Sequence, residues 1–153
     1  SFWLAFTSLQ AQEVAMTYEL TLEGAKEILA SARQYAVEAH APGASIAIVD
    51  AAGTLVFFER LNGSFPISSE VSIGKARSAA LFRFPTLKLE DGINNGRPAL
   101  LSVGEVSLKG GLPIVYGGKV IGGIGVSGAA SADQDVEIAM AGLKAAFLSP
   151  LMK

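Results

Sequence analysis

The pattern of apolar, polar and glycine positions is most regular between residues 110 and 131. Two apolar runs lie there, over residues 112–116 and 119–127, with Gly117-Gly118 between them. Two adjacent glycines suit the type I′ turn of a two-residue β-hairpin loop, because both central positions need positive φ. The pattern therefore predicts a hairpin that pairs Tyr116 with Lys119, Val115 with Val120 and Ile114 with Ile121.

The second strand of this hairpin has few side chains on one of its faces. Because successive residues of a strand alternate between faces, one face carries Val120, Gly122, Ile124 and Val126, and the other carries Ile121, Gly123, Gly125 and Ser127. A strand rich in glycine has little side-chain surface to pack. We therefore expect a close neighbour over Gly123 and Gly125, and we favour a helix over a ligand.

Helical spacing of apolar residues predicts three long helices. The first covers Thr21 to His40 with Thr21 as N-cap, and the second covers Ser68 to Phe84 before Pro85 stops it. The second is rich in alanine and glycine, so it is the expected cover for the bare strand face. The third begins after Ser131, which forms a capping box with Gln134. Its apolar positions are Val136, Ala139, Met140, Leu143, Ala146 and Phe147.

The remaining segments predict a second hairpin and a short helix. Residues 44–60 contain two strand-like runs around Asp50-Ala-Ala-Gly53, where the aspartate side chain can bond onward to the backbone. A short helix after Thr86 ends at Asn94-Asn95-Gly96, and residues 97–109 are compatible with strand or loop.

Composition excludes several classes of function. The chain has 153 residues and a net charge of −2, so it lacks the basic surface expected of a nucleic-acid partner. It contains no cysteine, which excludes disulfides and thiolate chemistry. His40 is its single histidine, which excludes a histidine-rich metal centre. Ser127 and Ser131 lack the surroundings of a nucleophile elbow, and Gly122–Gly125 is not a dinucleotide-binding fingerprint.

The first residues form an apolar stretch that is too short to span a bilayer. Residues 1–15 are compatible with the end of a secretory signal, which would make the protein periplasmic or secreted, or with an upstream or artificial extension of a cytoplasmic protein. A third interpretation, which we favour, is that residues 1–12 pack between subunits through Phe2, Trp3 and Phe6. We accordingly divide the chain into an extension, residues 1–19, and one domain, residues 20–150.

Several motifs in one order resemble the GlcG/HbpS-like haem-binding family, also described as haem-degrading domains. They cover roughly residues 20–147 and are Val49-Asp-Ala-Ala-Gly53 with Arg60, Ile73-Gly-Lys-Ala-Arg77, Gly110-Gly-Leu-Pro-Ile114, Val120-Ile-Gly-Gly-Ile-Gly-Val-Ser-Gly128, and the Asp135 helix with Ala141-Gly142. Ser78 stands where the family often has threonine. The resemblance implies a profilin-like α/β (α+β) sandwich, with a central, mainly antiparallel sheet and helices on its faces. It also implies homo-oligomers and haem as a cofactor.

The resemblance also directs attention to four candidate site residues. His40 lies at the end of the first helix, where it is either a capping residue or an axial haem ligand. Tyr18, Tyr35, Tyr116 and Met140 are further candidate ligands. Arg60, Lys75 and Arg77 could hold haem propionates or a small carboxylate, or could form surface ion pairs with Glu59, Glu70 or Asp50.

Three functions remain open at this stage. The first is a small oligomeric haem-binding or haem-handling protein. The second is an accessory or catalytic subunit that acts on a small hydroxy acid or aldehyde, with Lys75 and Arg77 holding the anion. The third is a purely structural oligomerisation module, which needs no pocket. We assign no catalytic residue, and we expect self-association, a small-molecule ligand, no nucleic acid and no membrane span.

Overall fold

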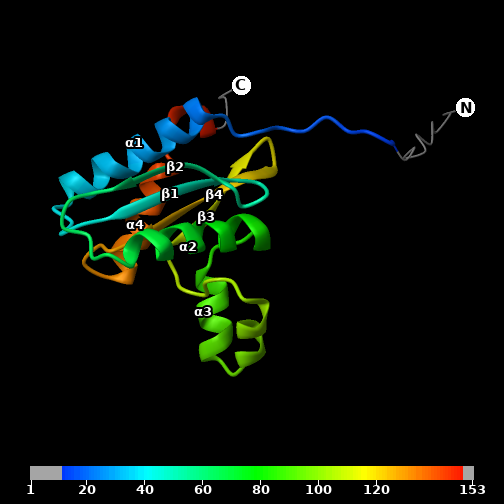
Figure 1. The fold of residues 1–153 in the computed structure, drawn as a ribbon. Coiled ribbons are helices and arrows are strands. Elements are labelled where there is room, and N and C mark those ends of the chain that lie inside the picture. The colour runs from blue at the N-terminus through cyan, green and yellow to red at the C-terminus, as the bar shows by residue number, and fades with distance from the viewer. Residues whose placement is uncertain (1–11, 150–153) are drawn as a thin grey trace, which may run out of the picture.

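A computed structural model describes residues 12–149 and shows a four-stranded antiparallel sheet between helices (Figure 1). The elements are α1 (Leu22–Glu38), β1 (Ser45–Asp50), β2 (Leu55–Arg60), α2 (Ser68–Phe82), α3 (Leu87–Asn94), η1 (Pro98–Val103), β3 (Gly111–Tyr116), β4 (Lys119–Ser127), α4 (Ala132–Gly142) and η2 (Ala146–Leu148). The strand order is β2-β1-β4-β3. Helix α2 covers one face of the sheet, and α1 and α4 cover the other. The predicted α+β class and the antiparallel sheet are confirmed.

Helix α1 begins as predicted and ends two residues early. The Thr21 hydroxyl accepts a hydrogen bond from the Gly24 N–H at 3.1 Å, so Thr21 is the N-cap. At the other end His40 adopts positive φ (53°). The N–H of His40 donates to the Val37 carbonyl, and the N–H of Ala41 donates to the Ala36 carbonyl. These two bonds form a Schellman motif, which satisfies the last carbonyls of the helix. His40 therefore closes α1 from outside the helix.

The hairpin over residues 44–60 is confirmed, with β1 antiparallel to β2. One carboxylate oxygen of Asp50 accepts hydrogen bonds from the N–H groups of Ala52 and Thr54, each at 2.9 Å. The hairpin at Gly117-Gly118 is also confirmed, and both glycines have positive φ.

The predicted register of the second hairpin is right next to the turn and wrong beyond it. Tyr116 pairs with Lys119 and Val115 with Val120, but Ile114 pairs with Gly122. Ile121 is the extra residue of a β-bulge, and such a bulge re-aims side chains. As a result Ile121 joins Ile124 and Val126 in the main core, on the side of α1 and α4. Strict alternation had placed it on the opposite face.

The glycine face of β4 lies against α2, as predicted. A Cβ atom on Gly123 or Gly125 would collide with backbone atoms of Ser72 or Ala76. Buried Ala76 and Ala80 of α2 pack there against Ala47 and Val49 of β1. The helix can approach the strand this closely because both facing surfaces carry only small side chains or none.

The last two predicted helix ends and one predicted helix face need correction. Helix α2 stops at Phe82, because Arg83 adopts positive φ (64°). Helix α4 stops at Gly142, and residues 146–148 form the separate 3₁₀ helix η2. In α4, Ile138 and Ala139 are buried, whereas Met140 is 53% exposed. The buried face is rotated towards Asp135, which is itself buried.

Candidate functional site

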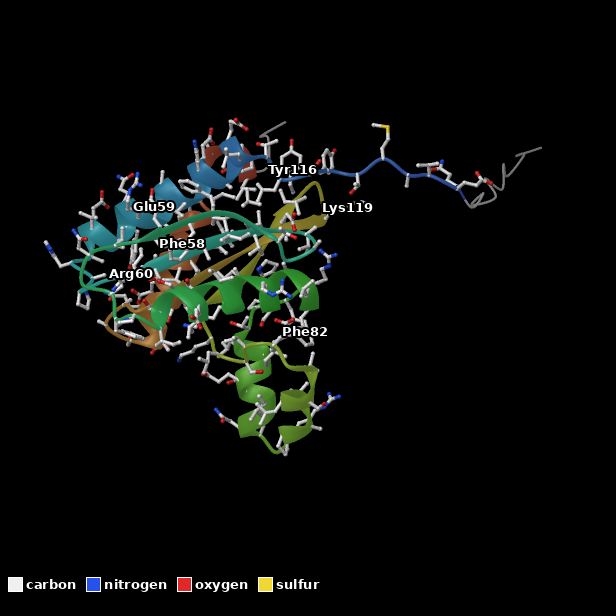
Figure 2. All side chains as sticks on the ribbon, in the orientation of Figure 1. Phe58, Glu59, Arg60, Phe82, Tyr116 and Lys119 are labelled. Atoms are coloured by element: carbon white, nitrogen blue, oxygen red, sulfur yellow. The ribbon has the colours of Figure 1, made fainter. Side chains whose placement is uncertain are left out.

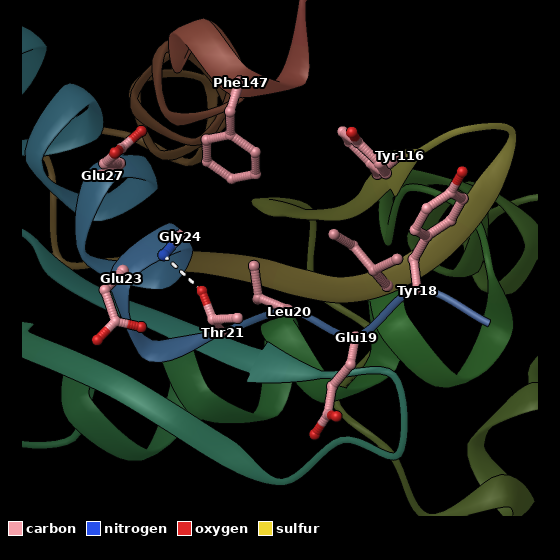
Figure 3. A pocket seen from close by; sticks show the side chains of 10 residues that line it. Tyr18, Glu19, Leu20, Thr21, Glu23, Gly24, Glu27, Tyr116 and Phe147 are labelled. Atoms are coloured by element: carbon pink, nitrogen blue, oxygen red, sulfur yellow. Dashed lines mark hydrogen bonds between the residues drawn. The ribbon is translucent and has the colours of Figure 1, made fainter. Parts of the chain in front are cut away.

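A cavity of about 330 Å³ lies where the N-terminal segment, α1, the β3–β4 hairpin and η2 meet (Figure 3). Aromatic and aliphatic side chains face it from separate segments: Tyr18 and Leu20 precede α1, Tyr116 and Ile121 belong to the hairpin, and Phe147 belongs to η2. Glu19, Glu23 and Glu27 also line it.

A second hollow of about 620 Å³ shares Tyr18, Tyr116 and Phe147 with the first. We call the two together the aromatic groove. The rings of Tyr18 and Tyr116 meet edge to face with centroids 4.8 Å apart. A Cβ atom on Gly117 would lie 3.3 Å from two atoms of the Tyr18 ring and closer still to a third. Gly117 thus allows both the positive φ of the turn and the close approach of the Tyr18 ring.

The groove can accept a flat, apolar ligand and offers it two phenols. Pockets that bind such ligands are mostly apolar, with a few placed polar groups. Tyrosine is also one of the side chains that hold haem iron in proteins. The sequence had identified Tyr18 and Tyr116 as candidate ligands, but it assigned Phe147 to the α4 face. No pattern in the sequence indicated that these segments converge.

A separate cavity of about 330 Å³ lies at the opposite end of the sheet from the aromatic groove and contains a buried ion pair. The side chains of Lys75 and Asp135 are only 4% and 7% exposed. The Lys75 ammonium donates to a carboxylate oxygen of Asp135 at 2.9 Å and to the Val126 carbonyl at 2.8 Å. The other carboxylate oxygen of Asp135 accepts the Ala129 N–H at 3.1 Å. Ser127 lines the cavity beside the pair, and we call this site the Lys75 cavity.

Asp135 is a residue that sequence reasoning assigned to a structural role at a helix start. Its position in the first turn of α4 is as predicted, but its side chain faces the interior. The partners suggested for Lys75 were Glu59, Glu70 and Asp50. The observed partner lies 60 residues away along the chain, so only the fold brings the two together.

The structure does not unite the four predicted site residues. Arg77 donates to the Gly53 carbonyl at 3.0 Å and pairs with Glu105 at 3.3 Å. Lys75, two positions earlier on α2, faces α4 instead. The Arg60 guanidinium donates to the Ser64 carbonyl at 2.6 Å.

His40 lies far from the aromatic groove. Thr21 and Gly24, at the start of α1, line the groove, whereas His40 follows the end of this 17-residue helix. At 1.5 Å per residue the helix separates them by about 25 Å. Arg60 pairs with Ser45 at the His40 end of the sheet, and Tyr116 and Lys119 label the other end in Figure 2. A haem in the groove of one subunit therefore cannot reach His40 of that subunit.

Two further observations bear on the function classes. Within residues 12–149 no group of three or more His, Asp or Glu side chains is arranged to hold a metal ion. In the same part of the chain, none of the helices combines the length and the apolar character needed to cross a membrane.

Comparison with known proteins decides the family. A family model described as "Haem degrading protein HbpS-like" matches residues 20–144. The chain belongs to the HbpS-like family. The resemblance seen in the sequence motifs is thereby confirmed.

Individual relatives of this HbpS-like chain agree in sequence and in fold. Protein GlcG of Escherichia coli is 43% identical over 84 residues, which is 54% of this chain and 63% of GlcG. The match therefore spans less than two thirds of that relative. A double mutant of Streptomyces reticuli HbpS has 32% identity and a TM-score of 0.80, over 94% of this chain and 96% of the other. The crystal structure of a PduOC–haem complex has 28% identity and a TM-score of 0.72, over 86% of this chain and 95% of the other.

Proposed function

We propose that this HbpS-like chain binds haem and that the aromatic groove is the binding site. The observation that carries the proposal is the convergence of Tyr18, Tyr116 and Phe147, from three separate segments, on one groove. Glu19, Glu23 and Glu27 also line this groove. The family supports it, as does the similarity to the PduOC–haem complex.

The residues of the groove fit the parts of a haem. The porphyrin is flat and largely apolar, so it would stack against the three aromatic rings. The Tyr116 phenol is the axial ligand that we favour, because Tyr116 lies on a strand of the sheet, whereas Tyr18 lies in the segment before α1. Lys119 is the cross-strand partner of Tyr116 and exposed, so it is placed to meet a propionate at the rim. When bound, haem would supply a redox-active iron.

The axial role of His40 stays a separate prediction. Its side chain is exposed, and Arg60 lies at the same end of the sheet. A haem held there would lie on the surface of one subunit or between subunits, away from the groove. Arg77 and Lys75 each already have an acidic partner within residues 12–149. The groove proposal and the His40 prediction therefore exclude one another within a subunit.

Titration of the purified protein with haemin, followed by visible absorption, tests the proposal and separates the two ligands. We expect Tyr116→Phe to shift the Soret band and weaken binding at least tenfold. Tyr35→Phe is the matched control, because this third tyrosine lies outside the groove and bonds to Glu137. His40→Ala should also keep the wild-type spectrum. A spectral change in His40→Ala with none in Tyr116→Phe would assign the iron to His40, and absence of binding by the wild type would overturn the proposal.

The Lys75 cavity supports a second candidate function, the binding of a small hydroxy acid or aldehyde. A pocket of polar groups beside Lys75 is what this function requires, and Lys75, Ser127, Ser131 and Asp135 provide it. Asp135 neutralises the charge of Lys75. The cavity therefore offers more partners to the hydroxyl groups of a ligand than to its carboxylate. Calorimetric titration with glycolate and glycolaldehyde tests the idea. Ser127→Ala should weaken binding, and the exposed Ser102→Ala is the control.

We also propose that the chain forms homo-oligomers. The described residues expose several large apolar side chains, among them Val14, Met16, Phe65, Ile67 and Leu101. Such surface is characteristic of protein contacts. A purely structural module, the third hypothesis, has no need of the two cavities. Light scattering of the full chain measures the assembly directly, and a monomer would refute it.

A further inference from the structure

Residues 12–17 form an arm, bent at residues 13 and 14, without a partner in the described part of the chain. All of them are exposed; Val14 is 84% and Met16 is 97% exposed. No backbone hydrogen bond connects residues 12–20 with any other described residue. Water satisfies the backbone groups of such an exposed segment, so its N–H and C=O groups remain available to pair with another strand.

The sequence of the arm is that of a strand with two different faces. Val14, Met16, Tyr18 and Leu20 alternate with Ala15, Thr17, Glu19 and Thr21. This period of two is the pattern of a half-buried β-strand. Leu20 is buried at 6% exposure and Tyr18 packs on Tyr116, so the base of the arm is anchored and residues 12–17 remain free. Six residues of strand reach about 20 Å.

One edge of the sheet, that of β3, is closed to an added strand at Gly111 and Pro113. The Gly111 N–H donates to the Thr86 hydroxyl, and the Gly111 carbonyl accepts the Thr86 N–H. Pro113, the next residue that faces outward on this edge, has no N–H. Proline and local cover are common ways to close a sheet edge.

The other edge, that of β2, is open. Leu61 bonds to Ala44, so by antiparallel alternation Glu59 and Phe57 bond towards β1, while Phe58 and Arg60 direct their N–H and C=O groups outward. No described residue pairs with those outward backbone groups. The strand Leu-Val-Phe-Phe-Glu-Arg contains neither proline nor lysine to block pairing. Figure 2 labels Phe58, Glu59 and Arg60 on this strand.

The arm cannot reach β2 of its own subunit in this structure. It leaves the body at the β3–β4 hairpin and runs away from the sheet (Figure 1). Charge also fits a pairing between two copies: Glu13 is the charged residue of the free arm, and Arg60 lies on β2. Arg33 of α1 is already paired with Glu59 of that strand. We propose that the arm of one copy adds as a fifth strand to the β2 edge of a second copy. This rests on the proposed self-association, and reciprocal exchange would give a two-fold dimer.

Cross-linking between two different chains tests the pairing, and the absence of native cysteine makes it specific. A tagged full-length chain with Thr17→Cys is mixed with an untagged chain carrying Leu55→Cys or Arg60→Cys, and a short bismaleimide is added. We expect tagged–untagged product with at least one of the two, and the one that reacts gives the strand direction. Asn95→Cys, exposed on the far side of α3, is the control and should give at least tenfold less product.

A proline variant tests whether the contact is a strand. Met16→Pro should reduce the cross-linked product at least fivefold and remove the slow hydrogen exchange expected for the Phe58 and Arg60 amides, because proline cannot complete the ladder. Gln12→Pro, at the end of the arm farthest from Tyr18 in sequence, should change both much less. An oligomer that gives no Thr17 product, or that keeps its exchange pattern in Met16→Pro, would overturn the arm contact alone. A monomeric full chain would overturn self-association as well. Haemin titration involves neither substitution, so it reports on the groove independently.

Discussion

The close contact between β4 and α2 yields a sharp prediction about stability. In Gly125→Ala the new Cβ would lie 3.0 Å from the Ala76 Cα and closer still to the Ser72 carbonyl and the Ala76 N–H. These are backbone atoms of a helix, so no side-chain rotation can relieve the contact. Because carbon atoms pack best at about 3.5–4.0 Å, α2 has to withdraw by something on the order of 1 Å. That movement loosens its buried contacts with β1.

Overpacking of this kind costs about 3 kcal/mol, the upper part of the usual range. For a chain of this size each kcal/mol lowers Tm by about 2–4 °C, so we expect a fall of roughly 6–12 °C in Gly125→Ala and a larger one in Gly125→Val. Gly24→Ala is the matched control. Its Cβ would lie 3.2 Å from the ends of the Leu20 and Phe147 side chains and 3.6 Å from the Thr21 hydroxyl oxygen, all side-chain atoms. Alanine also favours the helix by up to about 1 kcal/mol.

Differential scanning calorimetry of the wild type and the three variants measures these shifts. Gly24→Ala should melt at or slightly above the wild-type Tm. If Gly125→Ala melted within about 2 °C of the wild type, α2 could not be seated on the glycine face, and the packing described for β4 would be wrong.

Three further predictions concern polar contacts. Ser131→Ala removes the N-cap of α4 and should lower the free energy of unfolding by about 1 kcal/mol, measured as the urea midpoint; an unchanged midpoint would mean that the cap contributes nothing. Lys75→Met leaves the Asp135 carboxylate buried without its partner and should cost about 3–5 kcal/mol, whereas adding Asp135→Leu to it should restore most of the loss; equal melting of single and double variants would contradict this. The hydrogen bond from the Tyr35 phenol to Glu137, then desolvation and the nearby negative charge, raise the pKa of Tyr35 above its ordinary value of 10.0. Because the folded state holds this proton more tightly, the Tyr35 phenol stabilises the fold fully below pH 10.0, and this stabilisation is lost as pH rises through the higher folded pKa. In urea titrations across that pH range, Tyr35→Phe should therefore lose less stability than the wild type.

Local signals in the sequence were sufficient for the element starts and turns. Thr21 and Ser131 cap α1 and α4 through their own side chains, and each accepts the N–H three residues ahead. Asp50 closes its turn in the same local way. The paired glycines at 117 and 118 specify a turn type through their backbone freedom. Each of these features depends on atoms within a few residues, so the order of the sequence already contains the partners.

The tertiary structure decided what depends on atoms far apart in the chain. Strict alternation could not reveal the bulge at Ile121, because its placement follows from how β4 packs and pairs between two neighbours. The partner of Lys75 was hidden because Asp135 reads as an ordinary residue of a helix start until α4 is laid beside α2. The aromatic groove combines Tyr18, Tyr116 and Phe147, and no periodicity relates these three positions. A binding surface of that kind exists only once the fold has brought the segment before α1 and the segment after α4 to the same hairpin.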